Sequence, residues 1–284
     1  MGLAFAHRFA AVGMHLAIAD IEVPAIDSAL ADLRPTGAEA IGVRCDVSDP
    51  ASMEEMAAEV YDAYGAAHVI CLNAGVSAGG TMSDLKLIDW EWVLGVNLWG
   101  IIHGIDAFLN KLIIQDEGHF VITASICGHT CYPTSGPYTA TKHAAVAIAE
   151  TLYNELSAAG SRVGVTALCP GFVNTQITNS ERNRPEPLVD YAAPILSDED
   201  QRGREALLEA FGAAAHVPSD IAALVHDAIL DDTFWVFTDN EHDESISRRH
   251  AEILERRNPS KRVSLLEEAF GVAGVHPNTA PETQ

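Results

Sequence analysis

The stretch Phe120–Lys142, FVITASICGHTCYPTSGPYTATK, contains a complete change of hydrophobic period. Its first residues, Phe120–Thr123, are apolar or β-branched at every position, which is typical of a strand buried on both faces. From Tyr138 to Ala159 the apolar residues instead recur at helical spacing, which predicts an amphipathic helix. The stretch therefore predicts a strand, a loop and a helix, in the order of a parallel β–α unit.

The same alternation continues on both sides of this unit. Further strands are predicted at His15–Ala19, Ala40–Arg44, His68–Leu72, Val163–Leu168 and Phe234–Thr238, and further helices at Ser28–Leu33, Pro50–Tyr64, Leu87–Ile114 and Ser219–Leu230. Repeated units of this kind favour an α/β fold with a doubly wound parallel sheet, Rossmann-like, in a single domain. We expect this domain at residues 1–240, with a substrate loop at about 172–215. A charged C-terminal extension at 241–284 follows, with a helix near Asp243–Arg257.

Composition restricts the possible partners. The chain has 40 acidic and 17 basic residues and a net charge of −23, which repels phosphate backbones and acidic membrane surfaces. We therefore expect no nucleic acid and no membrane as partner, in agreement with the lack of a long apolar run and of a signal peptide. The five cysteines are scattered and complete no zinc pattern with histidine, so we expect reduced thiols, a cytoplasmic location and no metal site.

Polar residues follow several of the predicted strands. Asn73, Ser125 and Pro170-Gly171 each come directly after a strand, and ligands of open α/β sheets bind beyond the carboxyl ends of the strands. Tyr138 and Lys142 are four residues apart, so they share one face of a helix. Each feature alone is common, as a turn serine or a solvated helix face. Their convergence at one sheet edge is what indicates a site.

Five ordered motifs resemble those of the short-chain dehydrogenase/reductase family over about residues 2–238. They are Cys71-Leu72-Asn73-Ala74-Gly75, Val96-Asn97-Leu98-Trp99-Gly100, Ile122-Thr123-Ala124-Ser125, Pro137-Tyr138-Thr139-Ala140-Thr141-Lys142 and Pro170-Gly171-Phe172-Val173-Asn174-Thr175. The resemblance implies an NAD(P)-dependent oxidoreductase that moves a hydride between a nicotinamide cofactor and a secondary alcohol or ketone. It also implies a homodimer or homotetramer. We expect the small-molecule substrate to be apolar, such as a steroid-like alcohol or ketone.

The resemblance also implies a role for each catalytic residue. Tyr138 exchanges the proton, and Lys142 lowers the pKa of this phenol from its unperturbed value of about 10 and binds the nicotinamide ribose. Ser125 binds the reacting oxygen, and Asn97 holds a water that links Lys142 to solvent. The implied cofactor-binding residues are Gly2, Asp20, Asp46, Val47, Asn73, Ala74, Gly75, Tyr138, Lys142, Pro170, Gly171, Val173 and Thr175.

Asp20 determines the expected cofactor. It ends a predicted strand, where a carboxylate can accept hydrogen bonds from the adenosine ribose and repels a 2′-phosphate. Ile21 and Glu22 follow it, with no adjacent arginine or lysine to bind such a phosphate. We therefore expect NAD rather than NADP.

The chain departs from the family pattern at its first residues. Family members begin with an apolar strand and a Thr-Gly-x-x-x-Gly-x-Gly turn, and Gly2 aligns with the last of these glycines, so the fold is expected to be N-terminally truncated. The absence of this central strand is expected to leave unpaired backbone and an apolar gap. Either the written start omits residues, which the intact motifs favour, or the gene is truncated. In the second case the chain would be a catalytically impaired scaffold or oligomerising protein.

Overall fold

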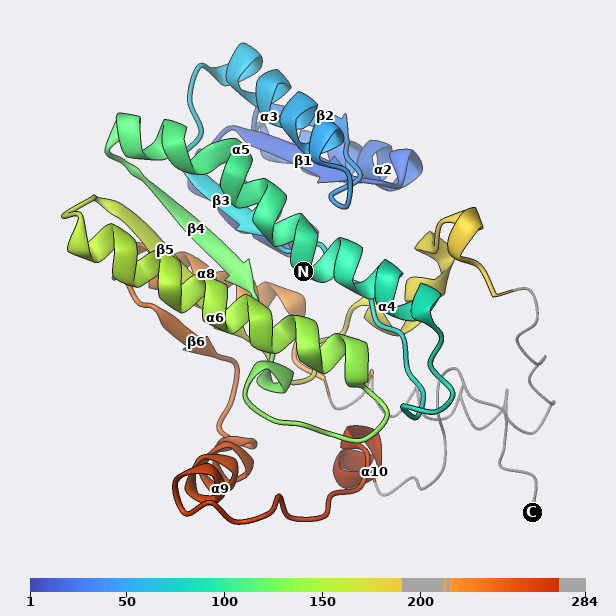
Figure 1. Cartoon of the computed structure of the whole chain (residues 1–284). Helices are drawn as coiled ribbons and strands as arrows, with labels where there is room; N and C mark the ends of the chain where they lie inside the picture. The colour runs from blue at the N-terminus through green and yellow to red at the C-terminus, as the bar shows by residue number, and fades with distance from the viewer. Residues whose placement is uncertain (191–211, 213–214, 271–284) are drawn as a thin grey trace.

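The structure, a computed structural model, describes residues 1–190, 212 and 215–270 (Figure 1). Its strands are β1 (Leu16–Asp20), β2 (Ala40–Arg44), β3 (Val69–Leu72), β4 (Gly118–Thr123), β5 (Val163–Cys169) and β6 (Trp235–Phe237). All paired strands are parallel. The predicted strands agree with these bounds to within two residues, and the prediction of a single-domain α/β, Rossmann-like fold is confirmed.

Helices cover both faces of the strands. On one face α3 (Pro50–Tyr64), α5 (Gly100–Gln115) and α6 (Gly136–Ala158) contribute to one core cluster. On the other face α1 (Gly2–Ala11), α2 (Val23–Leu33) and α8 (Pro218–Leu230) contribute to a second. Figure 1 shows α5 and α6 in front of β4 and β5, with α8 behind them. These layers leave the carboxyl ends of the strands open to a ligand.

Local sequence explains where these helices begin and end, as α3 illustrates. The side chain of Asp49 caps its first turn by accepting a hydrogen bond from the Ala51 N–H at 3.1 Å, and Pro50 occupies the first helical position. Gly65 ends the helix with φ of +72°, a conformation that other residues rarely adopt. The predicted bounds of this helix are therefore correct at both ends.

The sheet is divided into two parts. β1 pairs with β2, and β3, β4, β5 and β6 form a separate four-stranded sheet. Between these parts a cavity of about 1350 Å³ is lined by Leu16–Ala19 of β1 and Val69–Leu72 of β3, so no described strand pairs with the facing edges. The prediction that β1 is buried on both faces is wrong, because this open edge exposes three of its five residues. The division is the apolar gap expected from the sequence.

One helical run, Leu87–Gln115, is long and apolar enough to span a membrane by length and composition alone, with a mean hydropathy of 1.4. It comprises α4 (Leu87–Leu94), a π-helical turn (Gly95–Trp99) and α5. Phe108 and Leu112 of α5 belong to the core cluster shared with α3 and α6. Core helices of globular proteins meet the same criteria, so this run is weak evidence for a membrane span.

The predicted substrate loop and extension are described in part. The described part of the loop contains two 3₁₀ helices, η4 (Gln176–Asn183) and η5 (Glu186–Leu188). Residues 191–211 and 213–214 lie outside the described residues. In the extension, α9 (Asp243–Leu254) matches the predicted helix, whereas α10 (Leu265–Phe270) was not predicted. Residues 271–284 lie outside the described part of the chain.

Stability is expected to fall in acid because His119 is buried in its neutral form. Its ring lies 2.8 Å from the Thr166 hydroxyl, and burial lowers the pKa of His119 from 6.5 to about 4. Between these values the unfolded chain binds the extra proton, so the free energy of unfolding decreases as the pH falls, by up to about 3 kcal/mol. Urea titrations from pH 7 to pH 4 measure this slope. His119→Asn should flatten it, whereas His68→Asn, at an exposed position, should leave it unchanged; equal slopes in all three proteins would contradict the assignment.

Candidate active site

The ends of β4 and β5 are held together where Ser125 leaves the sheet. The backbone N–H of Ala124 donates to the Leu168 carbonyl at 2.8 Å, and that of Ile126 donates to the Pro170 carbonyl at 3.0 Å. Between these bonds the Ser125 hydroxyl accepts a hydrogen bond from the Cys127 N–H at 3.1 Å and lies 3.5 Å from the Pro170 carbonyl oxygen. Its position is thus fixed by backbone on two sides.

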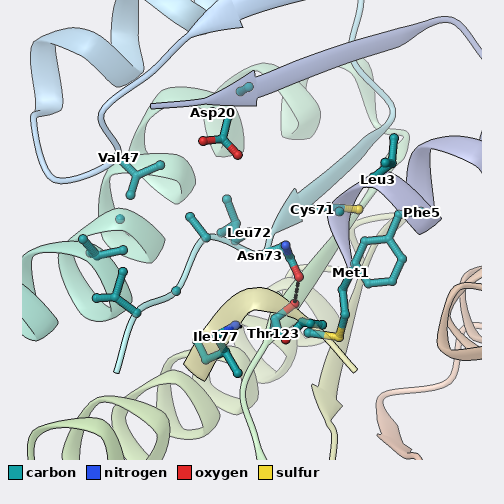
Figure 2. A pocket seen from close by; sticks show the side chains of 18 of the residues that line it. Met1, Leu3, Phe5, Asp20, Val47, Cys71, Leu72, Asn73, Thr123 and Ile177 are labelled. Atoms are coloured by element: carbon teal, nitrogen blue, oxygen red, sulfur yellow. Dashed lines mark hydrogen bonds between the residues drawn. The ribbon is translucent and has the colours of Figure 1, made fainter. Parts of the chain in front are cut away.

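One cavity contains almost all of the predicted site. Figure 2 shows Asp20 and Val47 on one side, Met1 on the other and Asn73 between them. The lining includes Ser125 and all predicted cofactor-binding residues, namely Gly2, Asp20, Asp46, Val47, Asn73, Ala74, Gly75, Tyr138, Lys142, Pro170, Gly171, Val173 and Thr175. A carboxylate at one end and a buried ammonium near the other fit the two riboses of a dinucleotide. The individual roles stay predictions.

Lys142 is buried beneath this cavity. Its Nζ donates a hydrogen bond to the Thr123 carbonyl oxygen at 2.8 Å and lies 5.5 Å from the centre of the Tyr138 ring. Burial lowers the pKa of Lys142 from 10.5 to about 8, since it disfavours the charged form. The ammonium nevertheless remains the main form at neutral pH.

The surroundings of the Tyr138 ring determine the pKa of its phenol. Burial raises the pKa of the Tyr138 phenol well above its usual value, the neighbouring Cys127 raises it further, and a hydrogen bond with Ser125 acts in the opposite direction. The Lys142 ammonium lies 5.5 Å from the ring centre and donates to the Thr123 carbonyl oxygen, and its role in lowering the pKa of this phenol stays a prediction. Tyr138 therefore carries its proton at neutral pH and can donate it to a ketone oxygen.

Asn97 lies behind the cavity rather than in its wall. It is fully buried in the π-helical turn, where its Oδ1 accepts from the Val76 N–H at 2.8 Å and its Nδ2 donates to the Val76 carbonyl at 2.9 Å. Nδ2 also lies 3.3 Å from the Thr141 hydroxyl. These bonds connect the loop after β3 to α6, and such π turns often occur at functional sites. The predicted water-binding role stays a prediction.

Two features of the site were missed by the sequence. The Thr123 carbonyl accepts the hydrogen bond of Lys142, and the Thr123 hydroxyl donates to Asn73 Oδ1 at 3.2 Å (Figure 2). The position of Thr123 at the end of β4 is the signal by which the sequence could have identified it. Arg182 lies across the cleft and contacts Glu22 Oε1 through Nε and Nη2, each at 3.0 Å. These two residues are 160 positions apart, so no local pattern predicts the contact. Although no arginine is adjacent to Asp20 in sequence, Arg182 lines the same cavity as Asp20.

The expected absence of a metal site stays a prediction. Among the described residues, Asp239, Glu241 and His242 each offer one ligand atom within 4.8 Å of the others. Asp239 also accepts a hydrogen bond from the His216 ring at 2.9 Å. Clusters of acidic groups at the surface are common without a bound ion.

Comparisons with known proteins agree with this geometry. Residues 1–186 match the family model described as "short chain dehydrogenase". A "CLA biosynthesis dehydrogenase/reductase" of Lactiplantibacillus plantarum is 30% identical over 250 residues, covering 85% of each chain. A "1-deoxy-11-beta-hydroxypentalenate dehydrogenase" of Streptomyces exfoliatus is 31% identical over 244 residues, covering 85% of this chain and 80% of that protein. The crystal structure of a protein from Burkholderia phymatum in complex with NAD is similar with a TM-score of 0.87 and 38% identity, covering 93% of this chain and 94% of that chain.

Proposed function

The chain belongs to the short-chain dehydrogenase/reductase family, and we propose that Tyr138, Lys142 and Ser125 carry out its chemistry. As a member, it is an NAD(P)-dependent oxidoreductase that transfers a hydride between the cofactor and a secondary alcohol or ketone. The observation that supports these roles most directly is the buried ammonium of Lys142 beside the Tyr138 ring, in the same cavity as Ser125.

The mechanism assigns one task to each side chain. A nicotinamide held in the cavity beside Asn73, Tyr138 and Lys142 would supply the hydride chemistry at the reacting carbon. In the reductive direction Tyr138 donates its phenolic proton to the ketone oxygen, which the Ser125 hydroxyl holds by a hydrogen bond. The Lys142 ammonium then stabilises the resulting phenolate, and the reverse order of proton transfers serves alcohol oxidation.

The activity is tested by incubating the full chain with NAD and a panel of secondary alcohols. Absorbance of the reduced nicotinamide reports turnover, and calorimetry reports NAD binding separately. Turnover of an alcohol supports the proposal. The divided sheet favours one alternative, a scaffold of this fold without activity, and a chain that binds no NAD and turns over no alcohol would be that scaffold.

We expect NAD to be the preferred cofactor because of Asp20. Its exposed carboxylate lines the cavity at the end of β1, where it can bind ribose hydroxyls and repel a 2′-phosphate. Glu22 is the partner of Arg182, which keeps this guanidinium engaged. Asp20→Ser should lower the ratio of kcat/KM for NAD to that for NADP by about tenfold or more, the equivalent of 1.4 kcal/mol. Asp32→Asn, outside the cavity, serves as the charge control, and an unchanged ratio in Asp20→Ser would refute the assignment.

Further expectations concern assembly and substrate. We expect a homodimer or homotetramer in the cytoplasm, formed by one catalytic domain at residues 1–240 with the extension 241–284 attached. The substrate side of the cavity includes Ile126, Phe172, Ile177 and Leu265, which suits an apolar alcohol or ketone. Light scattering of the purified chain determines the oligomer.

A further inference from the structure

The extension contains a concentrated positive segment. The 15 residues Arg248–Arg262 include six of the 17 lysine and arginine residues of the chain and only two glutamates. The remaining chain carries 11 basic and 38 acidic residues. We call Arg248–Arg262 the basic segment. It covers the end of α9 and the turn toward α10, and Figure 1 shows both helices beside the loop that enters α6. A local excess of positive charge in so acidic a chain points to an anionic ligand.

A cavity of about 510 Å³ opens on the basic segment. It is lined by Arg249, Arg257 and Arg262 together with Cys131, Tyr132, Pro133, Glu252, Ile253, Pro259 and Ser260. Its single carboxylate, Glu252, is buried and already accepts hydrogen bonds from the backbone N–H and the hydroxyl of Ser260. Arg257 pairs with Glu255 at 2.5 Å. The lining as a whole therefore retains excess positive charge.

Arg262 is held in place with one donor unused. Its Nη2 donates to the Ser245 carbonyl at 3.0 Å, and its guanidinium lies 5.2 Å from the centre of the Tyr132 ring. Its Nη1 is buried and, in the part of the chain that the structure describes, donates no hydrogen bond. A guanidinium with a spare donor is the usual partner of a carboxylate or phosphate oxygen.

This cavity adjoins the catalytic one. Pro133 lines both, and Ser264 and Leu265, directly after Arg262 and Val263, line the catalytic cavity. Tyr132 lines the smaller cavity, and its hydroxyl donates to Glu268 of α10 at 3.1 Å. We propose that the basic segment binds the anionic head group, carboxylate or phosphate, of an elongated apolar substrate whose alcohol or ketone lies at Tyr138. The substrate part of this inference rests on the proposed function.

The test compares binding of decanoate, decyl phosphate and decanol to the full chain by calorimetry. In Arg249→Gln/Arg257→Gln the Kd of the anionic probes should rise at least tenfold, and the Kd of decanol should not change. Lys111→Gln/Arg162→Gln, which removes two exposed charges elsewhere, should change all Kd values less than twofold. Arg262 is left intact because it packs on Tyr132, and thermal unfolding confirms that both variants fold.

Each outcome decides the proposal. Tighter binding of decyl phosphate or of decanoate identifies the phosphate or the carboxylate as the head group. Equal binding of decanol and decanoate, an equal loss in the control variant, or binding of inorganic phosphate without either decyl anion overturns it. Turnover separates this result from the proposed function: in Arg249→Gln/Arg257→Gln, kcat/KM should fall about tenfold for a secondary hydroxy acid and stay unchanged for the neutral alcohol of equal length. Arginine-dependent binding without any turnover would retain the anion site and refute the proposed function.

Discussion

Replacement of Tyr138 by phenylalanine is expected to lower kcat by about 1000-fold or more while the protein remains folded. The substitution removes only the hydroxyl that exchanges the proton, and positioned acid–base groups contribute roughly 10² to 10⁴ to rates. The ring keeps its place in α6 and its contact with Lys142. The other predicted cofactor-binding residues are unchanged, so the Kd of NAD should change far less than kcat.

A second tyrosine on the same helix provides the control. Tyr153 lies on α6 and packs on Phe234, with 4.9 Å between ring centres, outside the cavity. Tyr153→Phe should retain kcat within twofold. Steady-state rates, NAD titration and thermal unfolding on all three proteins complete the comparison. Substantial turnover in Tyr138→Phe would remove this residue from the mechanism, and equal losses in both variants would indicate a structural effect.

Lys142→Met is expected to lower kcat by roughly 10²-fold or more and yet to make the fold more stable. Methionine fills a similar volume but provides no cation to stabilise the Tyr138 phenolate. In the wild type the buried ammonium is destabilising, because its pKa is about 8 in the folded chain against 10.5 for an exposed lysine. Removing it gains up to about 3 kcal/mol at neutral pH, from which about 1–3 kcal/mol is lost by leaving the Thr123 carbonyl without its donor.

The pH dependence of unfolding distinguishes this explanation from simple repacking. Between pH 8 and 10.5 the unfolded wild-type chain binds the lysine proton more tightly than the folded chain, so the free energy of unfolding rises with pH in this range. Lys142→Met should lack the rise. Lys111→Met, at an exposed lysine, should keep both the rise and the wild-type kcat. A rise of equal size in Lys142→Met would show that another group causes it.

Most helices and strands could be predicted because each one is determined by the residues within it and at its ends. Each buried strand is a short apolar run, and Asp49-Pro50 and Gly65 mark the ends of α3 by their backbone preferences. The prediction failed for the burial of β1, because burial depends on what lies beside a strand and not on its own residues. The same limit applies to α10, which is short and carries no clear apolar period.

The sequence predicted which residues form the site, but it did not predict their contacts or their pKa values. Ser125, Tyr138 and Lys142 could be located from their spacing, and the structure brings them to one cavity. Their protonation could not be predicted, because the pKa of Tyr138 depends on burial by many distant residues. The contact of Arg182 with Glu22 joins elements 160 residues apart, and no sequence period reports such a pair.

The division of the sheet has a thermodynamic consequence. β1 and β2 form a two-stranded unit without ladder bonds to β3, so this unit can open locally at a lower free energy than the four-stranded sheet. The cleft spans the division, with Asp20 on one part and Asn73 on the other (Figure 2). A dinucleotide that contacts both parts binds only the closed form, and it stabilises that form by RT ln(1 + [L]/Kd). The amide-exchange protection of β1 and β2 would then rise with the concentration of the cofactor, while that of the four-stranded sheet would depend on it less.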